Sequence, residues 1–115
     1  MIPNLIFFFL KGVIFVGVLE NKFQADLRKE IEARLPGAIV NKNDANYRQG
    51  FPDLIVLYED QYAILECKKS AHERYRPNQE LYLKRLGQYV FSATIYPENK
   101  EEVLDELERS FKTRR

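Results

Sequence analysis

Two short apolar runs separated by a polar turn occupy the middle of the chain. They cover residues 54–58 and 62–65, and both have the length and the β-branched and aromatic content of strands. Residues 59–61 between them are short enough for a hairpin turn. Because each run is almost continuously apolar, we expect both faces of the hairpin to be covered, as in the middle of an α/β sheet.

Apolar positions with a helical period lie on either side of this hairpin. They predict helices over residues 20–35, 77–86 and 99–111, of which the first ends at Pro36-Gly37 and the second at Gly87. The residues expected to face the core are Phe23, Leu27, Ile31 and Leu35 in the first, Leu81, Leu83 and Leu86 in the second, and Val103, Leu104, Leu107 and Phe111 in the third.

Two further strands complete the predicted set. Residues 38–40 form a short apolar strand and residues 89–96 a longer one, while residues 41–49 are polar and rich in turn formers. The order is therefore α-β-β-β-α-β-α. This order predicts an α/β fold with a central mixed sheet flanked by helices.

The first 19 residues differ from the rest of the chain. Residues 5–19 are apolar except for Lys11, Gly12 and Gly17. The run is shorter than the ~18–20 apolar residues of a spanning helix, and it lacks the positive start of a signal peptide. An extension without function, a dimer contact and a membrane anchor remain open. We favour the extension, with residues 20–115 as a single folded domain that does not use a membrane.

Composition limits the kinds of protein this chain can be. A length of 115 residues suits one core, and a net charge of +1 gives no overall attraction to nucleic acid. The single cysteine, Cys67, forms no internal disulfide and fits a reducing cytoplasm. The single histidine, His72, argues against a histidine-based catalytic or metal triad, and no CxxC pair suggests structural zinc.

The polar residues that flank the hairpin carry the candidate chemistry. Glu66 and Lys68 share one face of a strand, and Cys67 points to the other face. A two-residue turn at positions 59–60 would place Asp53 opposite Glu66, whereas a three-residue turn would rotate Asp53 away unless a bulge corrected it. In the first case two carboxylates and an amine converge. Such a pair of acids suits a hard cation such as Mg²⁺ or Mn²⁺.

Gly50, Pro52-Asp53, Glu66-Cys67-Lys68 and Gln79 together resemble the motif of the PD-(D/E)XK nuclease superfamily. The chain looks more narrowly like the small VRR-Nuc-type nucleases of phages and is similar in plan to archaeal Holliday-junction resolvases. The resemblance covers roughly residues 20 to 108, although the Val-Arg-Arg signature is not visible. It implies a restriction-endonuclease-like core, with residues 20–115 as the nuclease domain.

The resemblance also implies a metal site. Asp53 and Glu66 would bind Mg²⁺, with Mn²⁺ as a substitute, and Glu20 on the first helix and the backbone carbonyl of Cys67 would complete the set of ligands. Gln24, one helical turn after Glu20, would assist. The alternative for Glu20 is an acid placed at a helix start by the helix dipole.

Asp53, Glu66, Lys68 and Gln79 are the catalytic residues that the resemblance implies. Lys68 would orient or deprotonate the attacking water, or stabilise the developing charge. The alternative for Gln79 is an ordinary surface glutamine.

A local basic segment is the candidate nucleic-acid contact. Residues 68–85 contain six basic residues against two acidic ones, interleaved with Tyr75 and Tyr82. A solvated basic face is the alternative. The residues predicted to contact nucleic acid are Lys42, Arg48, Lys69, Arg74 and Arg76.

The converging acids and lysine favour a metal-dependent nuclease, and the resemblance implies that it is a DNA endonuclease that selects branched or otherwise structured DNA. Because a Holliday junction is two-fold symmetric, we expect a homodimer. Its place of action would be the cytoplasm, that of the host cell if the protein is phage-encoded. A non-catalytic nucleic-acid-binding module on the same fold is one alternative. An ordinary α/β domain whose polar strand ends are solvated is another.

Overall fold

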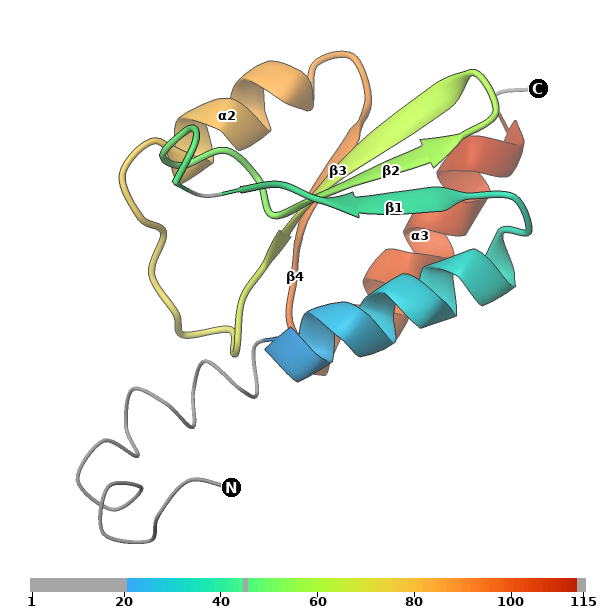
Figure 1. Cartoon of the computed structure of the whole chain (residues 1–115), viewed down its shortest axis with the longest axis horizontal. Helices are drawn as coiled ribbons and strands as arrows, with labels where there is room; N and C mark the ends of the chain where they lie inside the picture. The colour runs from blue at the N-terminus through green and yellow to red at the C-terminus, as the bar shows by residue number, and fades with distance from the viewer. Residues whose placement is uncertain (1–20, 45, 114–115) are drawn as a thin grey trace, which may run out of the picture.

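The computed structural model describes residues 21–44 and 46–113, so residues 1–19 and Glu20 lie outside the described residues (Figure 1). A helix over residues 21–34 comes first. It is followed by β1 (Ile39–Lys42), β2 (Leu54–Tyr58), β3 (Gln61–Cys67), α2 (Gln79–Leu86), β4 (Phe91–Ile95), the 3-10 helix η1 (Pro97–Asn99) and α3 (Lys100–Thr113). The predicted order of helices and strands is confirmed.

The four strands form one mixed sheet in the order β1-β2-β3-β4. β1 pairs with β2, and β2 with β3, in antiparallel orientation, whereas β3 and β4 run parallel. A parallel pair needs a connection that crosses over the sheet, and α2 supplies it. The predicted mixed α/β fold is therefore confirmed.

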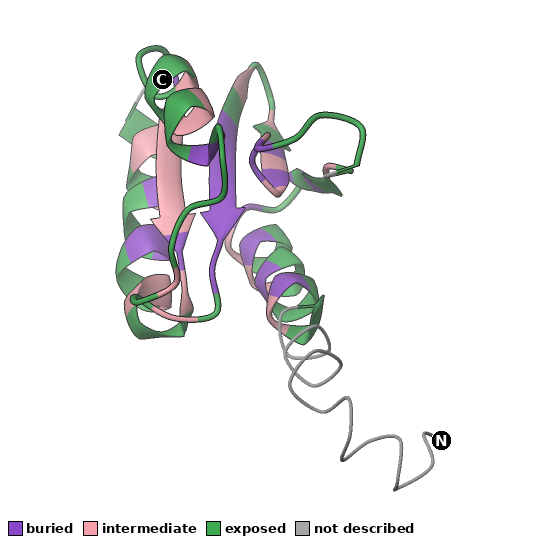
Figure 2. Ribbon diagram, turned by 90° about the vertical axis from the view of Figure 1, so that its left-hand side faces the viewer, coloured by how far each residue is buried: buried purple, intermediate pink, exposed green. Residues whose placement is uncertain are grey.

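The hydrophobic core lies on one face of the sheet. Leu27, Ile31 and Leu35 of the first helix are buried there, together with the predicted inner residues of α3. They pack against alternate residues of β2 and β3, and β3 is buried over most of its length, as Figure 2 shows. Fully burying one such side chain contributes about 1.5–3 kcal/mol, so this face supplies most of the stability. The predictions for the first and last helices are confirmed.

The prediction that α2 buries its leucines was wrong. Leu81 is 54% exposed and Leu83 is only half-buried, whereas Gln79 is the buried residue of the helix. Positions 79, 83 and 86 share one helical face, and position 81 points away from it. That face packs on the polar end of the sheet, so a glutamine occupies its innermost position.

The expectation that both faces of the hairpin are covered holds only in part. β3 is buried from Ala63 to Cys67, but Ile39, Leu57 and Tyr62 are exposed. These three lie opposite one another across β1, β2 and β3. The reason is length, because α2 has eight residues and spans only ~12 Å. It covers the end of the sheet that carries the candidate site and leaves the hairpin end open.

Several boundaries also differ from the predicted ones. β1 continues through Asn41 and Lys42, which were predicted as loop, because both pair with β2. β4 begins at Phe91 instead of residue 89. α2 begins at Gln79, two residues later than predicted, because Asn78 has a left-handed φ of 71°. Backbone pairing and backbone conformation set these boundaries, so the pattern of polar and apolar side chains did not predict them.

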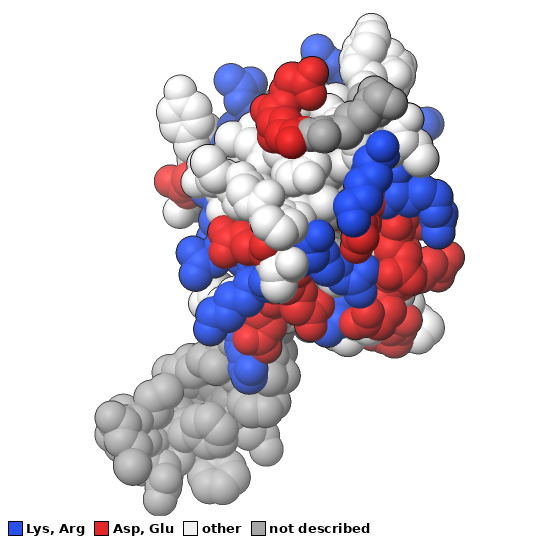
Figure 3. Space-filling view, turned by 90° about the vertical axis from the view of Figure 1, so that its right-hand side faces the viewer, with Lys and Arg blue, Asp and Glu red and all other residues white. Residues whose placement is uncertain are grey.

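Charges of both signs are mixed over the face formed by the first helix and α3. Figure 3 shows Lys and Arg side chains among Asp and Glu side chains on one side of the molecule. Arg34 pairs with Glu101 and Asp105 of α3, each at 2.7 Å, and Lys100 pairs with Glu30 at 2.9 Å. This face is therefore a poor candidate for a DNA-binding surface. No helix in residues 21–44 or 46–113 is long and apolar enough to cross a membrane.

Candidate functional site

The hairpin turn sets the geometry of the site. Tyr58 pairs with Gln61, so only Glu59 and Asp60 form the turn, and Glu59 adopts a left-handed φ of 57°. The pairing continues to Leu54 opposite Leu65. The next position on β2's side is Asp53, which therefore lies opposite Glu66. Of the two registers that the sequence left open, the structure has the one that brings the acids together.

Backbone hydrogen bonds hold the two acids in place. The backbone N–H of Asp53 donates to Oε1 of Glu66 at 3.2 Å, and Oδ2 of Asp53 accepts from the backbone N–H of Cys67 at 2.9 Å. Glu66 is 1% exposed and Asp53 is half-buried. Cys67 faces the hydrophobic core on the opposite side of β3, as predicted.

Glu66 is hard to ionise in this environment. Its pKa rises to about 8, mainly because the carboxyl group is buried and also because the charge of Asp53 is close; the Lys68 ammonium acts in the opposite direction. A hydrogen bond between the two carboxyl side chains adds to the rise. Burial and the neighbouring Asp53 therefore favour the protonated form of Glu66. A cation between the two acids would favour their ionised forms.

Lys68 and Gln79 complete a buried polar network. Lys68 is 3% exposed, and its Nζ donates to Oε1 of Gln79 at 2.6 Å and to the backbone carbonyl of Arg74 at 3.2 Å. The same Nζ lies 3.6 Å from Oε2 of Glu66, which accepts a short hydrogen bond from Nε2 of Gln79. Gln79 is 5% exposed, so it is not a surface glutamine. The strand end is thus a built polar centre and not a solvated cap.

Gly50 and Asn78 set the start of α2 and so the position of Gln79. Gly50 has a φ of 84°, and a Cβ there would lie 2.5 Å from the Pro77 carbonyl oxygen and 2.6 Å from the Asn78 Cβ. Only glycine tolerates both this conformation and this approach. The glycine before the Pro-Asp step therefore positions the helix that carries Gln79.

Three contributors to the site were not identified from the sequence. The carbonyl of Arg74 accepts from Lys68, and the Tyr75 ring centroid lies 5.3 Å from Nζ of Lys68. Asn43 bonds to both ends of the Pro-Asp step, through its N–H to the Asp53 carbonyl and through Nδ2 to the Pro52 carbonyl, each at 2.8 Å. A turn-forming Asn and an aromatic beside basic residues were visible in the sequence, but their partners depend on the tertiary structure.

The donor chemistry fits a hard divalent cation. Asp53 and Glu66 offer carboxylate oxygens close together. When both groups are ionised they repel each other, and a cation between them would offset this repulsion. Among residues 21–44 and 46–113, no group of three or more Asp, Glu, His or Cys side chains could hold a metal ion. The third acid predicted for the site, Glu20, lies outside the described residues. The backbone carbonyl of Cys67 remains the fourth predicted ligand.

Gln24 gives a further indication of a missing polar partner at this end of the sheet. It is 8% exposed, and its Oε1 has no hydrogen-bond partner within the described part of the chain. A pocket of about 400 Å³ lined by Gln24, Asn21, Lys42 and Leu54 adjoins it. Leu54 directly follows Asp53, and Gln24 lies one helical turn after position 20.

The residues predicted to contact nucleic acid, Lys42, Arg48, Lys69, Arg74 and Arg76, are all exposed. Arg76 lines a pocket of about 390 Å³ together with Asp53, Gln79 and Phe51. Arg48 bonds to the side chain of Tyr82, a contact that raises the pKa of its guanidinium. Lys42 lies at the end of β1, on the far side of β2 from Glu66. The structure therefore places Arg76 in one pocket with Asp53, whereas the other four predicted residues do not line that pocket.

The arrangement of elements has a counterpart among known proteins. Neither a family model nor a curated protein matches the chain. A solved structure described as "VRR_NUC domain" superposes with a TM-score of 0.62 at 21% sequence identity, covering 76% of this chain and 95% of that chain. The chain has a VRR-Nuc-like fold. In this VRR-Nuc-like fold the acids, the lysine and the glutamine meet where the sequence motif predicted.

Proposed function

We propose that this chain is a metal-dependent nuclease that hydrolyses phosphodiester bonds in DNA. The supporting observation is a fully buried glutamate, Glu66, that faces Asp53 and contacts Lys68 and Gln79. Burying ionisable groups costs free energy even when they are paired and hydrogen-bonded, so their presence here favours a functional role. Strongly perturbed carboxyl groups beside a pocket are typical of catalytic sites.

Asp53 and Glu66 would hold Mg²⁺ or Mn²⁺, with Glu20 and the Cys67 carbonyl as further ligands. A bound ion of this kind polarises a phosphodiester oxygen and lowers the pKa of a coordinated water. Asp53 opens onto the pocket of about 390 Å³, where Arg76 can bind a phosphate. DNA would therefore approach the acids from the side of Gly50 and Arg76.

Lys68 is placed to act on the water or on the phosphate. An ammonium group has three N–H donors, and the Gln79 side chain and the Arg74 carbonyl take two of them. Oε2 of Glu66 lies 3.6 Å from Nζ, and on this side the third donor would orient a water molecule or stabilise the negative charge that develops on the phosphate. Gln79 acts as a positioning residue, because it bonds to Lys68 and Glu66 together.

The finer proposal is an endonuclease that selects branched or otherwise structured DNA and acts as a homodimer. The apolar row Ile39–Leu57–Tyr62 lies exposed on the open end of the sheet and supports a protein–protein contact. A two-fold dimer would present two sites to a symmetric junction. We propose the cytoplasm as its location, since the only cysteine is buried in the core.

A cleavage assay tests the proposal. Plasmid, forked and four-way-junction DNA are incubated with Mg²⁺ and wild-type protein, Asp53→Asn or Lys68→Met. Asp60→Asn in the exposed turn and Lys29→Met on the exposed face of the first helix are matched controls. We expect both site variants to lose about 100-fold or more in rate and the controls to keep it.

Two results would decide against this function. Cleavage that survives both Asp53→Asn and Lys68→Met would exclude the proposed site. DNA binding without cleavage by any form of the protein would favour the non-catalytic nucleic-acid-binding module.

A further inference from the structure

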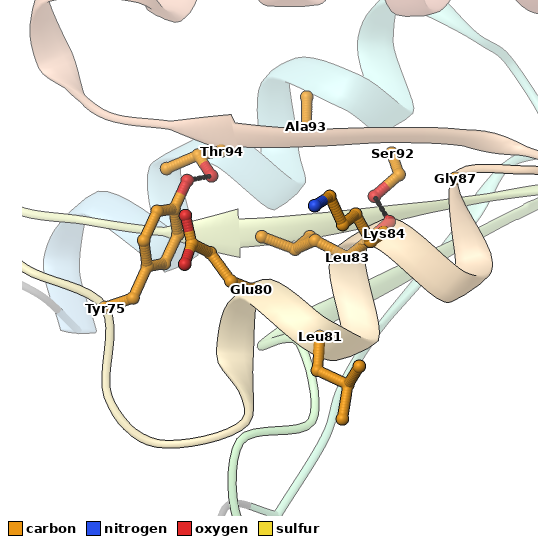
Figure 4. Close-up of a pocket in the computed structure, with 9 residues that line it drawn as sticks. All are labelled: Tyr75, Glu80, Leu81, Leu83, Lys84, Gly87, Ser92, Ala93 and Thr94. Carbon is orange, nitrogen blue, oxygen red and sulfur yellow. Dashed lines mark hydrogen bonds between the residues drawn. The ribbon is translucent and has the colours of Figure 1, made fainter.

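A groove of about 650 Å³ lies between α2 and β4, beside the candidate site. Tyr75, Glu80, Leu83, Lys84, Ser92 and Thr94 contribute to its lining. Figure 4 shows Glu80, Leu83 and Lys84 extending from α2 and Ser92 and Thr94 lying on β4. Neither the metal-binding acids nor Gln79 line this groove, so it is separate from the pocket that contains Asp53.

Tyr75 forms a wall shared by the groove and the catalytic lysine. Its ring centroid is 5.3 Å from Nζ of Lys68, and its hydroxyl bonds to Oγ1 of Thr94 at 2.6 Å (Figure 4). Thr94 is also the β4 residue paired with Glu66. The groove therefore begins one aromatic ring away from Lys68. A ligand in it would be a direct neighbour of a phosphate held at the site.

The lining suits a nucleobase better than a second phosphate. Leu83 and the Tyr75 ring offer apolar and aromatic surface for the flat face of a base. Glu80 can accept from an amino or imino N–H, and Lys84 can donate to a ring nitrogen or carbonyl. The carboxylate of Glu80 would repel a phosphate. A groove that binds the phosphate backbone of DNA would be expected to carry basic side chains and no acidic ones. This groove has one basic and one acidic side chain, Lys84 and Glu80.

We infer that the groove between α2 and β4 receives one unpaired base of the substrate strand, next to the phosphodiester bond that is cut. This inference rests on the proposed nuclease function and explains its selectivity. Removing a base from a duplex costs unstacking and unpairing energy, and this cost is smallest where the base is already unpaired. Forks, flaps and junctions supply such bases, so they would be cut in preference to intact duplex.

The first experiment combines a groove variant with a missing base. Glu80 and Lys84 are exposed, so Glu80→Ala/Lys84→Ala should keep the fold. Glu102→Ala/Arg109→Ala removes the same pair of charges from exposed positions of α3, outside the groove and outside residues 68–85, and is the matched control. Forked DNA carries an abasic residue at each nucleotide flanking the mapped cut, one at a time. We expect the groove variant to cut intact forked DNA roughly tenfold more slowly than wild type.

The groove substitutions and the missing base should not have additive effects on the cleavage rate. On the substrate whose missing base would fill the groove, wild type should also slow by roughly tenfold, and the groove variant should show no further loss. Glu102→Ala/Arg109→Ala should behave as wild type on every substrate. Equal losses for the groove variant on intact and on all abasic DNA would overturn the inference.

A binding experiment separates this inference from the nuclease proposal. Asp53→Asn protein is mixed with forked DNA that carries 2-aminopurine beside the cut or, if no cut is found, at the unpaired positions of the fork. We expect its fluorescence to change on binding, and the change to disappear when Glu80→Ala/Lys84→Ala is added. Fluorescence that does not respond to these groove substitutions would overturn the inference even if cleavage is found. Absence of cleavage, with a groove-dependent fluorescence change, would remove the nuclease proposal alone.

Discussion

At the scale of single residues, two opposing effects act on the protonation state of Glu66. Burial of its carboxyl group favours the protonated form, yet a cation site would need the group ionised. The charge of Asp53 also favours the protonated form of Glu66, whereas the ammonium group of Lys68 favours the ionised form. If the pair holds a cation, as we propose, binding of that cation would release the proton of Glu66.

This conflict predicts an unusual dependence of stability on pH. The pKa of Glu66 is raised from 4.5 to about 8, so the folded protein binds more protons than the unfolded chain between these values. The free energy of unfolding of metal-free protein should then fall as pH rises from about 5 to about 8.5. The part due to Glu66 is on the order of 4 kcal/mol at most. Urea unfolding in EDTA at a series of pH values measures it.

Glu66→Gln is the control for that series, because it keeps the shape and stays neutral. The difference between wild type and Glu66→Gln isolates the titration of this one group. As pH rises, wild type should lose several kcal/mol in the free energy of unfolding relative to Glu66→Gln. Parallel stability curves for the two proteins would show that Glu66 titrates normally.

Gln79 tests whether the buried network needs a residue that both donates and accepts. Gln79→Leu would remove one of the two acceptors of Lys68 Nζ and the amide donor to Oε2 of Glu66. We expect a loss of about 2–3 kcal/mol in the free energy of unfolding, together with strongly reduced cleavage. Gln88→Leu, at an exposed position, should change neither quantity. A Gln79→Leu protein as stable and active as wild type would remove the network from the mechanism.

At the scale of elements, the sequence predicted best where the side-chain pattern itself is regular. The first helix and α3 each repeat apolar residues along one face, and both bury those residues as predicted. The pairing of Asp53 with Glu66 depended on a choice between two turn lengths. Glu59 in a left-handed conformation makes the shorter turn, and no residue type at positions 59–61 signals this.

α2 could not be placed by pattern because its environment is polar. A glutamine at position 79 counts against burial in any hydrophobicity pattern, but here it bonds to two other buried polar side chains. The residues of β1 beyond Val40 were missed for a similar reason, since an edge strand carries polar side chains while its backbone pairs. The motif located the site, and the tertiary contacts that build it were beyond the reach of sequence.

The start of α2 gives a prediction at this scale. In Gly50→Ala, the new Cβ would collide with the backbone of Pro77 and Asn78 and would need to keep a φ of 84°. The start of α2 should shift and withdraw Gln79, so cleavage should fall together with stability. Gly37→Ala is a matched control, since its φ is 94° but nothing lies within 4 Å of the new Cβ.

The two alanine variants should separate strain from collision. Gly37→Ala should cost about 1–2 kcal/mol in the free energy of unfolding and leave cleavage intact. Gly50→Ala should cost more and impair cleavage. Comparable stability losses with full cleavage in both proteins would contradict the role assigned to Gly50. Unfolding in urea and the plasmid assay supply the two readings.

At the scale of the whole molecule, the sheet divides into two ends. α2 covers the end with the acids and the lysine, while the hairpin end exposes the row Ile39–Leu57–Tyr62 on the same face. The opposite face is closed by the first helix and α3. DNA and a protein partner would thus meet different parts of one surface, which suits a dimer bound to a branched substrate.

The dimer prediction belongs to this exposed row. Leu57→Glu would place a charge in the middle of the row and should convert a dimer into a monomer. Tyr89→Glu, at another exposed aromatic, is the control and should leave the association unchanged. Sedimentation velocity over a range of concentrations measures the result. Wild-type protein that sediments as a monomer throughout would remove this dimer from the account.

Binding of Mn²⁺ to wild-type protein and to Asp53→Asn, followed by electron paramagnetic resonance at pH 7.5, tests the central claim most directly. If Asp53 and Glu66 share a cation, wild type binds Mn²⁺ and Mg²⁺ displaces it, Asp53→Asn loses at least about tenfold in affinity, and the turn variant Asp60→Asn binds as wild type. Equal affinity for Mn²⁺ in wild type and Asp53→Asn would contradict the account.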